Sequence, residues 1–130
     1  MSEGRASFGY LPCIWREVVQ AAEWAGQARA LGTGIAAGKN RAKQRVRLRF
    51  LYQKIKLLAD TAFAILQPQS ELFRLSQRER VIEDFLHCIE QELLGKEHPD
   101  IAATVYFQRA TYAIDELLAL VDAVLQQQQR

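Results

Sequence analysis

The sequence predicts an all-α protein, a four-helix antiparallel bundle with short loops, folded as one domain over residues 1–130. Proline and glycine gather at residues 32–38, 68 and 95–99, and they divide the chain into four segments. Each segment repeats apolar residues at the three- and four-residue spacings of an amphipathic helix, and none alternates like a strand. Short connections between such helices favour an antiparallel bundle. An N-terminal arm of about residues 1–11 precedes the first helix.

The first helix is expected over residues 12–31, because Pro12 is well tolerated in a first helical turn. We expect the glycines at 32, 34 and 38 to end it. Its apolar face is formed by Ile14, Trp15, Val18, Val19, Ala22 and Ala25.

The second helix is expected over residues 40–66, with Asn40 as its N-cap. It ends at Gln67-Pro68, because proline cannot continue the hydrogen-bond ladder. Two apolar stripes predict contact with more than one neighbour. The first contains Leu48, Leu51, Ile55, Leu58, Ala62 and Leu66, and the second contains Val46, Phe50, Leu57 and Ala64.

The third helix is expected over residues 76–94, where Ser76 and Glu79 match the capping-box pattern and Gly95 is the expected C′ residue. Its seam consists of Ile82, Phe85, Ile89 and Leu93. Before it, residues 72–73 are expected to form a short helical turn or to plug the end of the bundle.

The fourth helix is expected from Pro99 to about residue 127. Its seam alternates spacings of four and three residues, which predicts left-handed packing near about +20° and leaves self-association open. The seam contains Ala103, Phe107, Ala110, Ile114, Leu117, Val121 and Val124.

Charge is distributed unevenly along the chain, although the net charge is only +2. Residues 1–69 hold 11 Lys or Arg against 4 Asp or Glu, whereas residues 70–130 hold 6 against 11. The halves therefore carry about +7 and −5, which favours pairing of the halves or head-to-tail association.

The strongest functional signal is the basic stretch at residues 39–56, which holds eight Lys or Arg and no acid. A helical projection places Arg41, Arg45, Arg49, Tyr52 and Lys56 on one face, and Lys43, Arg47 and Lys54 on a second line. Such a face suits phosphates, and Tyr52 is placed to stack on an unpaired base. The alternative is a solvated face whose charges are balanced by neighbouring acids, namely Glu79, Glu83, Glu90 or Asp115.

These residues predict a non-enzymatic binding or accessory protein whose basic helix engages a polyanion, with nucleic acid as the first choice. The rival prediction is a protein–protein adaptor, scaffold or assembly chaperone that binds an acidic partner through the basic helix and Trp24. Trp24 lies on a polar helical face, which is typical of an interface anchor. Packing against the glycine-rich loop or the N-terminal arm is the other interpretation of Trp24.

Arg80 and His87 have the R-x(4–6)-H arrangement, and the third helix in this respect resembles the HEPN helical-bundle family, whose RNase site carries that motif. The resemblance implies a metal-independent ribonuclease as a remote alternative. Val81 stands where that family has a polar residue.

A second local resemblance lies at residues 35–51, where Ile35-Ala-Ala-Gly38 precedes Arg49-Phe-Leu51. This stretch is similar to one in the four-helix-bundle family associated with ribosomal-RNA intervening sequences. That family has Glu in place of Ala37 and two helices before the stretch, where this chain has room for one. We therefore assign no family on this basis.

No cofactor or metal is predicted. Asp84 and His87 have the spacing of one carboxylate–histidine pair, whereas a di-metal bundle site needs two. We expect Cys88 to be a small core residue and Cys13, at a helix start, to have a lowered thiol pKa. Without a signal peptide or an apolar stretch of about 20 residues, the chain is expected to be cytoplasmic, with reduced thiols and no membrane contact.

Overall fold

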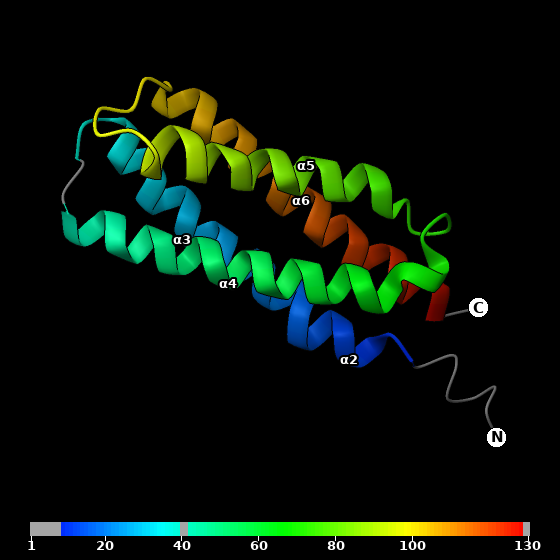
Figure 1. The fold of residues 1–130 in the computed structure, drawn as a ribbon. Helices are drawn as coiled ribbons and strands as arrows, with labels where there is room; N and C mark the ends of the chain where they lie inside the picture. Colours follow the sequence, from blue (N-terminus) through cyan, green and yellow to red (C-terminus); the bar gives the residue numbers. More distant parts are fainter. Residues whose placement is uncertain (1–8, 40–41, 129–130) are drawn as a thin grey trace.

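The computed structural model describes residues 9–39 and 42–128, and its long helical segments run antiparallel to their neighbours (Figure 1). Within these residues there is no strand, so the predicted all-α four-helix bundle is confirmed. The elements are α2 (Leu11–Cys13), η1 (Ile14–Val18), α3 (Val19–Ala36), α4 (Ala42–Leu66), η2 (Gln67–Gln69), α5 (Leu75–His87), η3 (Cys88–Leu94) and α6 (Ala103–Gln128). The segments η1 and η3 are π-helical and lie within the first and third long helices.

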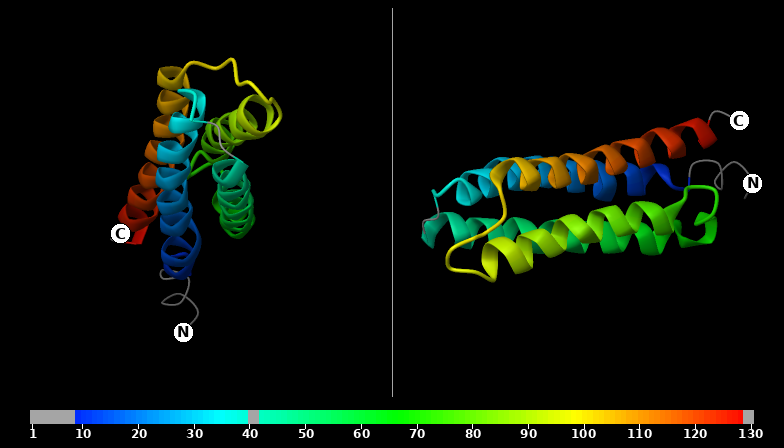
Figure 2. Two further views of the ribbon diagram at one scale, coloured as in Figure 1. Left: turned by 90° about the vertical axis from the view of Figure 1, so that its left-hand side faces the viewer. Right: turned by 90° about the horizontal axis from the view of Figure 1, so that it is seen from above.

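The four helices form two layers. Figure 2 shows α3 beside α6 in one layer and α4 beside α5 in the other. α3 also contacts α4, and α5 also contacts α6, so each helix packs against two neighbours around a common core. None of the described helices combines the length and the apolar composition that a membrane-spanning helix needs.

The core contains the whole predicted seam of the third helix and most of the first stripe of α4. The second stripe of α4 behaves differently: Phe50 touches Trp24 of α3, but Val46 and Leu57 are 71% and 61% exposed. The predicted contact through these two residues is wrong, because α3 and α5 pack on other sides of α4. The prediction that Trp15 belongs to the buried apolar face of the first helix is also wrong, since 58% of this residue is exposed.

The seam of α6 keeps the predicted alternation but is rotated by one residue. The buried positions are Tyr106, Ala110, Ala113, Leu117, Leu120 and Val124. Phe107 is 45% exposed, and Ile114 and Val121 are only partly buried. The predicted seam and the observed seam share Ala110, Leu117 and Val124, so the spacing of apolar residues does not distinguish between them. The observed seam is the one that buries the larger ring of Tyr106.

Gly32 explains how the Tyr106 ring is accommodated. α3 continues through Gly32 and Gly34 to Ala36, so the predicted end near residue 31 is wrong. A Cβ on Gly32 would overlap the Tyr106 ring, whose hydroxyl donates a hydrogen bond of 2.7 Å to the carbonyl of Ala28. Of the glycines at 32, 34 and 38, Gly38 alone has a positive φ, +105°, and the helix ends just before it.

The start of α5 differs from the predicted capping box. Its N-cap is Arg74, which has φ of +52° and no side-chain cap, while Ser76 lies inside the first turn. The preceding Phe73 is buried and meets Tyr10 edge to face at 6.0 Å between ring centroids. Residue 73 therefore plugs the end of the bundle, as one of the two alternatives for residues 72–73 predicted.

Gly95 ends η3, but its role differs from the expected left-handed C′ residue. Its φ is −81°, a conformation open to any residue. A Cβ at this position would lie 2.9 Å from the carbonyl oxygens of Glu90 and Gln91. Gly95 is therefore favoured by the close approach of the backbone.

Substitution of the two α3 glycines tests the Tyr106 contact. We expect Gly32→Ala to lower the free energy of unfolding by about 1–3 kcal/mol, because the added methyl group displaces a packed ring. Gly34→Ala is the matched control in the same helix, since its Cβ would meet nothing within 4 Å. It should raise stability by about 0.5–1 kcal/mol through helix propensity. Urea unfolding of both variants checks this, and equal effects would contradict the packing account.

Candidate functional site

α4 carries six of the predicted cations, and their neighbours divide them into four groups. The six are Lys43, Arg45, Arg47, Arg49, Lys54 and Lys56. Asn40 and Arg41, the predicted N-cap and the first residue of the predicted cationic face, lie outside the described residues. Asp60 is the one acidic residue within α4.

Arg45 forms the first group, because it reaches the C-terminal end of η3. Its Nη1 donates to the carbonyl oxygens of Leu93 at 2.7 Å and Lys96 at 3.2 Å, and its Nη2 donates to Leu94 at 2.6 Å. The last carbonyls of a helix have no partners within it, and their partial negative charge favours a cation. The guanidinium therefore caps η3 and fastens the first turns of α4 to it.

The second group, Tyr52 and Lys56, borders the acids of the neighbouring helix. Burial, followed by the charge of Glu90, raises the pKa of the Tyr52 hydroxyl. Lys56 forms an ion pair with Asp60 at 3.2 Å, and this hydrogen bond raises the pKa of the Lys56 ammonium, with a smaller contribution from Glu83. This side of α4 is therefore partly neutralised by carboxylates.

The third group lies on the side of α4 that faces α3. Arg47 donates from Nη2 to the amide oxygen of Gln27 at 3.2 Å. The Lys54 ammonium lies 5.9 Å from the ring centroid of Trp24, which also meets Phe50 edge to face at 6.0 Å. Both of these partners are uncharged. Trp24, the predicted interface anchor, is half-buried in this α3–α4 contact.

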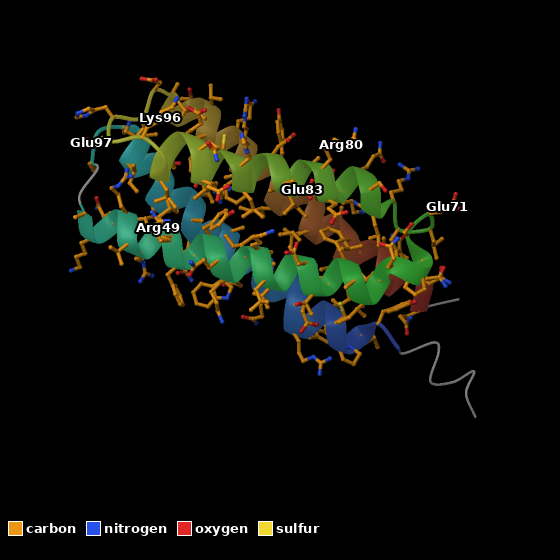
Figure 3. All side chains as sticks on the ribbon, viewed as in Figure 1. Arg49, Glu71, Arg80, Glu83, Lys96 and Glu97 are labelled. Atoms are coloured by element: carbon orange, nitrogen blue, oxygen red, sulfur yellow. The ribbon has the colours of Figure 1, made fainter. Side chains whose placement is uncertain are left out.

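Lys43 and Arg49 complete the exposed cations of α4. Among the described residues, neither of them forms an ion pair with a carboxylate. Figure 3 shows Arg49 on α4, on the side of the molecule that also carries Glu83 of α5.

A groove of about 630 Å³ between α5 and α6 holds more carboxylates than cations, and one of these carboxylates, Glu116, forms an ion pair with Arg78 of α5 at 2.9 Å. It is lined by Val81, Asp84, Arg109, Tyr112, Asp115 and Glu116. Asp115, one of the acids expected to balance α4, thus lies in this groove. Sequence reasoning missed the groove because its residues come from two helices whose relative rotation the pattern leaves open.

The residues of the enzymatic alternatives lie on α5. Arg80 and His87 are both exposed. In the part of the chain that the structure describes, no three His, Cys, Asp or Glu side chains form a metal-binding group. The ribonuclease alternative stays a prediction.

Both thiols are buried. Burial, with Glu17 nearby, raises the pKa of Cys13 to about 11, so the expectation of a lowered pKa is wrong. Cys88 is the small core residue that was predicted, and burial raises its pKa despite Arg109, whose Nη1 lies 3.4 Å from Sγ. Neither side chain is placed as a reactive nucleophile.

Comparison of the chain with protein-family models, with curated proteins and with solved structures finds no match.

Replacing Arg45 tests its structural role. We expect Arg45→Ala to lower the free energy of unfolding by about 1.5–3 kcal/mol, because the partly buried carbonyls of Leu93, Leu94 and Lys96 lose a charged donor. Arg49→Ala, one turn further along α4, is the control and should change stability by less than about 0.5 kcal/mol. Thermal or urea unfolding measures both. Similar losses in the two variants would argue against the cap on η3.

The raised pKa of the Cys13 thiol predicts that the protein loses stability at alkaline pH. Its ordinary pKa is 9.0 and its folded pKa about 11, so the unfolded chain releases this proton first as the pH rises. The free energy of unfolding should therefore be unaffected below about pH 9 and fall by about 2–3 kcal/mol by pH 11. Unfolding at several pH values measures this.

Cys13→Ala is the control for this pH dependence. It should show a smaller fall than the wild type, each protein being compared with its own stability at neutral pH. Part of the fall should remain, because burial also raises the pKa of Cys88 and of Tyr106. A fall of the same size in both proteins would contradict the assignment to Cys13.

Proposed function

We propose that this protein is a non-enzymatic nucleic-acid-binding protein that engages phosphates through the outward-facing cations of α4. The observation that carries the proposal is the open charge of Lys43, Arg47 and Arg49. All three are exposed, and in the described ranges none is paired with a carboxylate.

The charge of α4 supports this choice of partner. The helix holds six Lys or Arg and one Asp, a net charge of +5 on one rigid element. Like charges held close together repel one another, and a polyanion relieves that repulsion while releasing its own counterions. Arg45 contributes indirectly, because its cap on η3 holds the helix in place.

The acidic groove between α5 and α6 favours one direction of approach. Three of its four charged lining residues are carboxylates, and Asp84 and Asp115 repel a phosphate backbone, whereas Glu116 is paired with Arg78 at 2.9 Å. A nucleic acid is therefore favoured on α4 over this groove. Cations gather on α4 and carboxylates gather elsewhere in the bundle, so a basic surface on α4 is compatible with a net charge of only +2. We call the exposed surface of α4 that carries Lys43, Arg47 and Arg49 the basic face.

The salt dependence of binding tests the proposal. With three or four phosphates engaged, the logarithm of the association constant should fall with log salt at a slope of about −2 to −4. Arg47→Ala and Arg49→Ala should each reduce the slope by about 0.7–0.9. Fluorescence anisotropy with labelled RNA and DNA, between about 50 and 200 mM salt, measures it.

Arg80→Ala supplies the control for this experiment. Arg80 is also an exposed arginine, but it lies on α5 and outside the basic face (Figure 3). Its removal should leave affinity and slope close to those of the wild type. Absence of binding to any nucleic acid at the lowest salt would rule out the proposed function.

The adaptor alternative has one specific observation in its favour. Val46 and Leu57 are among the most exposed large apolar side chains of the bundle, and they lie on the same helix as the cations. An acidic protein partner with an apolar stripe would cover both kinds of side chain. Val46→Ser with Leu57→Ser should then abolish binding of that partner, whereas phosphate binding should persist.

A further inference from the structure

The two sides of α4 offer different surroundings to a bound polyanion. The side toward α5 borders Glu83 and Glu90, whose charges act on Lys56 and Tyr52. On the side toward α3, Arg47 contacts the amide of Gln27, and Phe50 and Lys54 contact the indole of Trp24, so these partners carry no charge. Near Tyr52 and Lys56 these carboxylates oppose a phosphate backbone, whereas the partners of Arg47, Phe50 and Lys54 add no negative charge.

Phe50 is the aromatic residue best placed to receive a base on that second side. Half of its surface is exposed, while Trp24 holds its ring in an edge-to-face contact at an interplanar angle of 84°. Tyr52, the aromatic residue singled out in the sequence, is less suitable. It is half-buried, and its hydroxyl lies beside the negative charge of Glu90.

Cations flank Phe50 along the same helical face. Arg47 lies three residues before it and Lys54 four residues after it, and both spacings place side chains next to one another on a helix. Lys43 continues the row one turn before Arg47. Aromatic rings set among cations are the arrangement by which proteins bind unpaired strands, with bases on the rings and phosphates on the cations.

We propose that the α3–α4 edge binds single-stranded nucleic acid, with an unpaired base stacked on Phe50 and the adjoining phosphates on Lys43, Arg47 and Lys54. The proposal rests on the function proposed above and adds to it the strand class and the site. Duplexes are excluded from the ring contact, because their bases are already stacked and paired.

The test compares a short single-stranded RNA that carries one 2-aminopurine base with the matching duplex. Wild-type protein should quench the 2-aminopurine fluorescence of the single strand on binding. Phe50→Ala should bind it about tenfold more weakly and lose the quenching. The salt slope should stay unchanged, since no phosphate contact is removed. Phe50→Trp, which keeps an aromatic ring, should restore affinity.

Phe107→Ala is the matched control variant. Phe107 is 45% exposed and lies 4.6 Å below the guanidinium of Arg29, so it is also a surface aromatic beside a cation, but on α6. Its removal should leave binding unchanged. Circular dichroism of each variant confirms folding, and Phe50→Leu serves as a second ring-free variant with an apolar side chain.

Three results would overturn the inference. If Phe50→Ala and Phe50→Leu bind like the wild type with an unchanged salt slope, base stacking is wrong while phosphate binding by α4 stands. If the duplex or polyglutamate binds as tightly as the single strand, and Phe50→Ala has no effect, α4 is a general polyanion surface. If no nucleic acid binds at low salt, the proposed function fails as well.

Discussion

Tyr106 is buried where α6 packs against α3, and its place there depends on two features of α3. Gly32 leaves room for the ring, and the carbonyl of Ala28 accepts its hydroxyl. Because this side chain is bulky and fully buried, it fixes the rotation of α6 about its axis. That rotation leaves Phe107 half-exposed and directs Tyr112 and Asp115 into the acidic groove against α5.

The rotation of α4 follows from its buried stripe in the same manner. Leu48, Leu51 and Ile55 are fully buried, so the cations of this helix are distributed around the remaining surface. Arg45 is drawn to the end of η3, where free carbonyls attract a guanidinium. The cations next to α5 meet carboxylates, whereas those next to α3 meet uncharged partners.

This division separates the cations of α4 within one stretch of sequence. Arg45 caps a π-helical segment, whereas Lys43, Arg47 and Arg49 are exposed and, among the described residues, form no ion pair with a carboxylate. The contact between Phe50 and Trp24 joins α3 to α4. It also holds the Trp24 ring beside the ammonium of Lys54. A surface aromatic held in this manner loses little conformational freedom when a planar ligand stacks on it.

The sequence by itself determined the four helices, their order, the buried stripe of α4 and the seam of α5, because apolar spacing and proline positions are local properties of the chain. It also located the basic segment. It did not determine the register of α6, since two heptads overlap there, or the extent of α3, since Gly32 is needed for packing. Only the tertiary structure decided which cations of α4 remain open, because Arg45, Lys56 and Arg47 have the same charge and differ only in the groups that neighbouring helices bring to them.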